Sequence, residues 1–128
     1  MSDEALLLDR LGAILAALER IPRRCSSIEK PEDFLTSEEG VDRMDAICMI
    51  LVAAGEEIKR IDRQTKGELF AAYPQVPWRG VMGLRDVLAH GYFDVDAEQL
   101  FAVCKERVPE LIAALSQMIK DLQQSSTP

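Results

Sequence analysis

The chain of 128 residues contains no apolar run close to the ~20 residues that a transmembrane helix needs. Its amino terminus also lacks a secretion signal, because Ser2-Asp3-Glu4 is acidic where a signal peptide is basic. The composition, with 48% hydrophobic residues, excludes a disordered chain. From these absences we expect a folded protein in the cytoplasm that has no contact with the membrane.

Metal-binding side chains are scarce. The sequence has one histidine and three cysteines, which are Cys25, Cys48 and Cys104, and no two of them have the spacing of zinc ligands. Cys48 and Cys104 fall on apolar helical stripes, where we expect them to be core thiols. We therefore expect no metal site and no cofactor.

Positive charge is in deficit. Fifteen basic residues stand against 22 acidic ones, for a net charge of -7. Broad nucleic-acid binding usually needs a basic face, so only a narrow contact is compatible with this balance. The balance equally fits a protein that does not act on nucleic acid. The basic residues for a local contact are Arg79 and Arg85 in one segment and Arg23, Arg24 and Lys30 in another.

The apolar residues recur at helical spacing throughout, and no segment alternates as a strand does. We predict an all-α fold, an up-and-down bundle of four to five helices, in a single domain over residues 1–122 with a frayed tail at 123–128. Pro109 is expected to bend or divide the last helix. The predicted helices cover residues 3–20, 38–63, 65–72, 78–90 and 96–122, with a loop at 22–31 and a short turn at 32–35.

Three helix starts carry capping residues. Ser2 precedes the first helix, Thr65 and Glu68 have the spacing of a capping box, and Asp96 with Gln99 repeats that signature before the last helix.

The helix predicted over 38–63 carries two apolar seams about 100° apart, where one face suffices for a monomeric surface helix. Two seams favour a dimer. The alternative is a central helix that is covered on two sides within one chain. One seam comprises Val41, Met44, Cys48, Leu51 and Ile58, and the other comprises Ile47, Ile50, Ala54 and Ile61.

The segment from Trp78 to Phe93 holds the single histidine and the single tryptophan. Arg85 precedes His90 by five residues, and Asp86 shares a helix face with His90. Histidine exchanges protons near neutral pH, and the arginine fork fits a phosphate. Together they suffice to cleave a phosphodiester without a metal ion. The plainer interpretation is a histidine that complements the charge of a helix end, or a surface ion-pair network.

This segment resembles the signature of the HEPN superfamily, and of its HepT-like branch in particular. That signature is an arginine, a polar residue, three further residues, a histidine, one residue and a tyrosine, and it is matched here by Arg85, Asp86, His90 and Tyr92. The approach Tyr73-Pro-Gln-Val-Pro-Trp78, the exit His90-Gly-Tyr-Phe93 and the Gly55-Glu56 pair are similar too. The similarity runs from about Leu6 to Leu115.

The resemblance implies a metal-independent endoribonuclease that acts as the toxin of a type VII-like toxin–antitoxin pair, as a homodimer with its active site at the dimer cleft. Arg85 and His90 would be catalytic, and Asp86 would orient His90. Tyr92 would contact RNA and accept AMP from a minimal nucleotidyltransferase antitoxin. Arg79 is a further candidate for a phosphate contact.

Two other functions stay open. One is a non-catalytic HEPN subunit that binds a nucleotide or scaffolds a nucleotidyltransferase. The other is a purely structural helical dimer. A HEPN fold alone does not decide between catalysis and binding.

Overall fold

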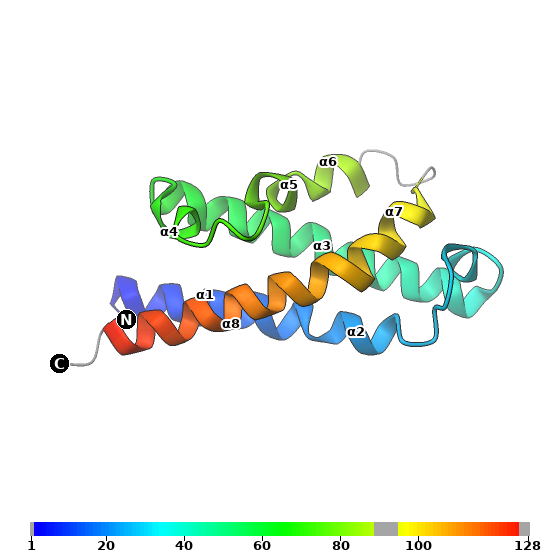
Figure 1. Ribbon diagram of the computed structural model, residues 1–128, viewed down its shortest axis with the longest axis horizontal. Helices are drawn as coiled ribbons and strands as arrows, with labels where there is room; N and C mark the ends of the chain where they lie inside the picture. Colours follow the sequence, from blue (N-terminus) through cyan, green and yellow to red (C-terminus); the bar gives the residue numbers. More distant parts are fainter. Residues whose placement is uncertain (1, 89–94, 126–128) are drawn as a thin grey trace.

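The computed structural model describes residues 2–88 and 95–125, apart from the side chains of Arg85 and Val87. Within these residues every regular element is helical, as predicted. Figure 1 shows an elongated bundle in which α1 and α8 run alongside each other and α3 spans the molecule. The elements are α1 (Asp3–Leu18), α2 (Arg20–Arg24), η1 (Pro31–Phe34), α3 (Glu38–Gln64), α4 (Glu68–Ala71), α5 (Trp78–Met82), α6 (Leu84–Leu88), α7 (Ala97–Ala102), η3 (Val103–Arg107) and α8 (Val108–Ser125).

None of the helices in the described residues is both long enough and apolar enough to cross a bilayer.

Two of the three predicted caps are confirmed. The Ser2 hydroxyl accepts a hydrogen bond from the backbone N–H of Ala5 at 3.1 Å. The Asp96 carboxylate accepts two, from the N–H groups of Glu98 and Gln99 at 3.0 and 3.1 Å. Each cap satisfies donors that the first helical turn leaves unpaired.

The capping box at Thr65 is wrong. The Thr65 hydroxyl donates backwards to the carbonyl of Ile61 at 2.9 Å, so this residue ends α3 and does not start α4. The residue before α4 is Gly67, whose φ of +74° lies in the left-handed region that glycine tolerates.

The loop predicted over residues 22–31 begins too early. After α1 ends at Leu18 the chain forms another helical turn, α2, and Ile21 buries its side chain in the core. Pro22 lies in the first turn of α2, where its missing N–H costs no helical hydrogen bond.

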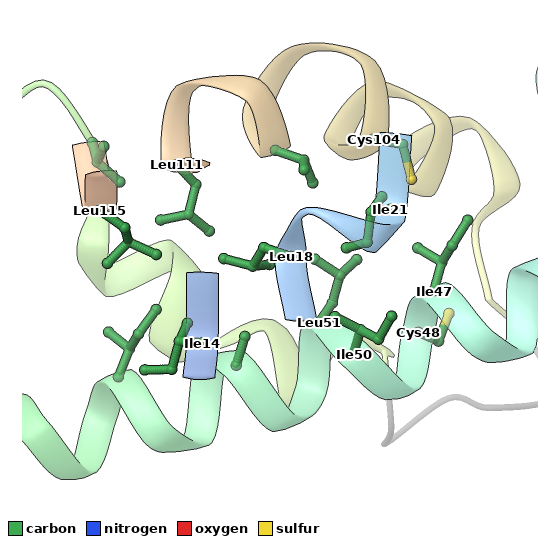
Figure 2. Close-up of a cluster of buried hydrophobic side chains, with 14 of the residues drawn as sticks. Ile14, Leu18, Ile21, Ile47, Cys48, Ile50, Leu51, Cys104, Leu111 and Leu115 are labelled. Atoms are coloured by element: carbon green, nitrogen blue, oxygen red, sulfur yellow. The ribbon is translucent and has the colours of Figure 1, made fainter. Parts of the chain in front are cut away.

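Seven of the nine residues of the two α3 seams are buried within one chain, and Val41 and Met44 are half-buried. In Figure 2, Ile47 and Ile50 of one seam and Cys48 and Leu51 of the other lie in the same cluster as side chains of α1, α2 and α8. The structure thus has the central helix that was the alternative to a dimer, and the seams by themselves carry no argument for a second copy. The buried residues of α3 are Gly40, Ile47, Cys48, Ile50, Leu51, Ala54, Gly55, Ile58 and Ile61.

The last predicted helix is divided, and the division lies directly before Pro109. Between α7 and α8 the turn η3 is π-helical, and the N–H of Val108 donates to the carbonyl of Val103 five residues earlier. Proline has no N–H, so an uninterrupted α-helix would leave the carbonyl of Lys105 without its donor. The wider turn keeps Leu100, Cys104 and Val108 buried on one side.

Candidate active site

The segment that leads into the motif is anchored by Trp78. Its indole N–H donates to the carbonyl of Tyr73 at 2.8 Å, and its ring lies 4.5 Å from that of Phe70, centroid to centroid. The side chain is buried and its polar atom is satisfied, as a buried tryptophan requires. The start of α5 is therefore fixed to the α4–α5 connection.

The single helix predicted over residues 78–90 is wrong, because Gly83 interrupts it. The N–H of Gly83 closes the last turn of α5 by donating to the Arg79 carbonyl at 3.1 Å, and the N–H of Asp86 donates to the Gly83 carbonyl at 3.0 Å. Gly83 itself has φ -88° and ψ 1°, outside the helical region. The described part of this segment, residues 78–88, thus forms two short helices, α5 and α6, which are called the motif helices below.

A second glycine brings these helices close to α3. An ideal Cβ built on Gly55 would lie 2.6 Å from the carbonyl oxygen of Val81 and 3.8 Å from the Cβ of Leu84. Real Cβ atoms do not approach an oxygen so closely, so only glycine permits this crossing. The close contact depends on the glycine of α3, since nothing lies within 4 Å of a Cβ on Gly80.

The structure places the predicted site residues only in part. Arg79 is exposed on α5, and Asp86 is exposed on α6. The backbone of Arg85 lies in α6, between Leu84 and Asp86. His90 and Tyr92 fall in residues 89–94, outside the described residues, and so does the predicted contact between Asp86 and His90.

A hydrogen-bonded chain, which the sequence did not reveal, ties the approach segment to α8. The Tyr73 hydroxyl donates to Asp121 at 2.6 Å, and the Gln117 amide donates to the other carboxylate oxygen at 2.8 Å. Burial and the neighbouring Asp121 raise the pKa of Tyr73 to about 12, and the two hydrogen bonds lower the pKa of Asp121. The phenol and carboxylate are 48 positions apart, so no local pattern could have paired them.

An apolar pocket of about 170 Å³ lies on the flank of α5 and α6. It separates these helices from η3 and the start of α8, and its only charged residues are Arg107 and Glu110. Arg107, which the sequence did not single out, thus lies beside the motif helices. The pocket is lined by Leu51, Val76, Pro77, Gly80, Val81, Leu84, Val103, Arg107, Val108, Glu110 and Leu111.

The prediction that Cys48 and Cys104 are core thiols is confirmed, and Cys25 is buried as well. Burial is the main cause that raises the pKa of Cys48 to about 11 and that of Cys104 to about 12. Both thiols are neutral at physiological pH and are therefore poor nucleophiles. In the described part of the chain no three histidine, cysteine or acidic side chains are grouped as metal ligands would be.

The sequence comparisons identify a family whose match includes these helices. A family model described as "Ribonuclease HepT-like" matches residues 14–118, a span that includes α3, the motif helices and most of α8.

Individual relatives are more distant. The chain is 33% identical over 78 residues to "Putative RNase MJ0127" of Methanocaldococcus jannaschii, which is 61% of either chain. It is 35% identical over 80 residues to "Probable ribonuclease HepT" of Thermococcus cleftensis, covering 62% of this chain and 66% of that one. The chain thus spans about six-tenths of the length of the curated relatives it matches. No solved structure matches it significantly.

Proposed function

The chain belongs to the HepT-like ribonuclease family, and on that premise we propose that it is a metal-independent endoribonuclease, the toxin of a type VII-like toxin–antitoxin pair. The observation that carries the proposal is the spacing of Arg85, His90 and Tyr92 inside the matched region. The names of the relatives, which describe them as RNases, support the same reaction class.

The proposed reaction is attack of a ribose 2′-hydroxyl on the adjacent phosphate. It needs a base that takes the proton of the nucleophile and an acid that protonates the leaving 5′-oxygen. His90 would fill one role in each copy of the chain, so two copies supply both. The guanidinium of Arg85 would stabilise the charge that develops on the phosphate oxygens, and Asp86 would orient His90. Arg79, exposed on α5, would add a phosphate contact.

The two copies would form a homodimer with the active site in the cleft between them. The feature that supports this pairing is Met49, which lies in the middle of α3 with 71% of its surface exposed. Val52 and Ala53, three and four residues on, share its face and are half-buried and exposed. An exposed methionine on a helix that also packs against the motif helices fits an interface, where methionine is enriched.

A minimal nucleotidyltransferase would be the antitoxin. By transferring AMP to the hydroxyl of Tyr92 it would place bulk and negative charge at the motif, which would repel the RNA backbone. Without AMP on its hydroxyl, Tyr92 would be accessible for contact with RNA.

The decisive experiment compares the chain with its His90→Ala variant. Each is induced alone in bacteria at equal soluble level, and purified protein is incubated with RNA. We expect growth arrest and cut RNA with cyclic-phosphate ends for the parent chain only. Cleavage that persists in His90→Ala overturns the mechanism.

A non-catalytic subunit that binds nucleotide or scaffolds a nucleotidyltransferase is the second candidate. The net charge of -7 favours it, since it opposes a long RNA contact. Binding of nucleotide without any RNA cleavage would select this function.

A further inference from the structure

Three arginines of α2 form a positive surface on an otherwise acidic chain. Arg20, Arg23 and Arg24 occupy positions i, i+3 and i+4, which places them on one helix face. From Arg20 to Ile28 the sequence has no acidic residue. Like charges at this spacing repel one another, and a bound anion would relieve that repulsion.

These arginines differ from four others in the protein. Arg10, Arg43, Arg60 and Arg107 each have a carboxylate within 4 Å. In the described residues, by contrast, no carboxylate lies within ion-pair distance of the three guanidinium groups of α2. Their charge is thus left uncompensated by the fold.

The turn η3 extends this surface. The ammonium of Lys105 donates to the carbonyl of Cys25, directly after Arg24, at 2.9 Å, and it also lies 5.6 Å above the ring of Phe101. These contacts hold Lys105 beside the end of α2. A cation is therefore added to the same surface from a segment 80 positions away.

Arg107 connects the surface to the motif helices. It lines the pocket whose other wall is formed by α5 and α6. Residues two positions apart on a helix point to different sides, so Arg107 carries positive charge around η3, from the α2 side where Lys105 lies to the side of the motif helices. Figure 1 shows the run from α7 into α8 between α6 on one side and α2 on the other. The ion pair of Arg107 with Glu110 is 3.4 Å long and exposed, so it contributes little and is easily exchanged.

We propose that Arg20, Arg23, Arg24, Lys105 and Arg107 form a basic strip that binds the phosphate backbone of RNA on one side of the motif helices. The inference rests on the proposed function and extends it, because it adds a contact outside the motif. A short strip of five cations reconciles RNA binding with a net negative chain, since the remaining surface is acidic. RNA is favoured over an acidic protein because the strip leads towards the helices that carry the motif.

The test measures binding of a labelled single-stranded 2′-O-methyl RNA, which has no free 2′-hydroxyl and cannot be cleaved by its attack. The variant is Arg20→Gln/Arg23→Gln/Arg107→Gln. The control is Lys59→Gln/Arg60→Gln/Arg63→Gln, which removes the same number of charges from exposed residues of α3. These lie about 24 Å or more along α3 from Arg43, the residue that contacts α2.

We expect the strip variant to bind the RNA on the order of tenfold more weakly than the control. The slope of log affinity against log salt should fall by roughly 0.7 for each lost phosphate contact, or about 2 in all. A further variant should act in the opposite direction: Glu106→Gln removes an exposed acid between Lys105 and Arg107 and should tighten binding. The strip variant and Glu106→Gln should both keep the thermal stability of the parent chain.

Equal affinities and slopes for the strip variant and the control overturn the inference while the proposed function stands, provided that the parent chain binds and cuts RNA. A parent chain that neither binds the probe nor cuts RNA overturns both. If the strip variant binds RNA normally but loses self-association in sedimentation, the strip contacts an acidic protein surface and the RNA contact is wrong.

Discussion

The backbone oxygen of Val81 lies so close to Gly55 that the Cβ of any larger residue at position 55 would be only 2.6 Å from it in ideal geometry. The longest helix and the first motif helix therefore meet through their backbones at Gly55. This contact fixes how deeply α5 and α6 sit against the core.

Gly55→Ala should displace the motif helices. The added methyl group cannot be accommodated without a shift of α3 against α5, and overpacking of this kind costs about 1–3 kcal/mol. We expect that loss in denaturant unfolding, together with a drop in RNA cleavage. The control is Gly12→Ala in α1, where nothing lies within 4 Å of the new Cβ and where alanine should stabilise by about 0.5–1 kcal/mol. Equal stabilities of the two variants would contradict the close crossing.

The hydrogen bond from Tyr73 to Asp121 should make stability depend on pH at alkaline values. The folded protein raises the pKa of Tyr73 from 10.0 to about 12, so folding favours the protonated phenol. This contribution is fully present below pH 10.0 and is lost as the pH rises through about 12. Denaturant unfolding of the parent chain and of Tyr73→Phe should show a difference that shrinks over this range. A difference that stays constant or grows would show that the phenol is not held in this way.

RNA cleavage should survive removal of metal ions. In the proposed chemistry His90 carries the protons and Arg85 neutralises the phosphate, so chelation by EDTA should leave the rate unchanged. Arg85→Lys should lower the rate by roughly 100-fold or more, because a lysine keeps the charge but loses the planar fork. Activity that EDTA abolishes and magnesium restores would refute metal-independent cleavage. A parallel preparation of His90→Ala controls for contaminating nucleases.

Met49→Glu should weaken the proposed dimer. A carboxylate buried between two copies of α3 raises the dissociation constant by at least about tenfold, or ~1.4 kcal/mol, which sedimentation velocity can measure. Leu35→Glu is the matched control, since Leu35 is 57% exposed and lies before α3. If both variants sediment as the parent chain does, the dimer does not use this face of α3.

Local signals predicted the fold well where a single segment decides the structure. Helical spacing located α3 within two residues, and the caps at Ser2 and Asp96 are as predicted because both depend on neighbours at most three positions away. The prediction at Thr65 was wrong for a related reason. Its hydroxyl can donate to a carbonyl of the preceding helix or accept from an N–H of the next one, and in the structure it donates to the carbonyl of Ile61.

The candidate site was harder to derive, because its geometry depends on contacts between segments. The spacing of Arg85 and His90 identified the family, yet it contained no indication that Gly83 ends a helix or that Arg107 lies across a pocket from Gly80. The two seams of α3 show the same limit: spacing predicts which residues are buried, but not whether the same chain or another one covers them.

The π-helical turn η3 has a consequence for changes in chain length. A π turn holds one residue more than an α turn, so a deletion of one residue between Val103 and Arg107 would leave Leu100 and Val108 in phase on a continuous α-helix. The cost is the one helical hydrogen bond that Pro109 cannot donate. The same deletion within α8 would rotate everything beyond it by about 100° and carry Leu115 or Met118 away from the core. Within α7, η3 and α8, η3 is thus the place where a change of one residue in chain length alters least which side chains face the core.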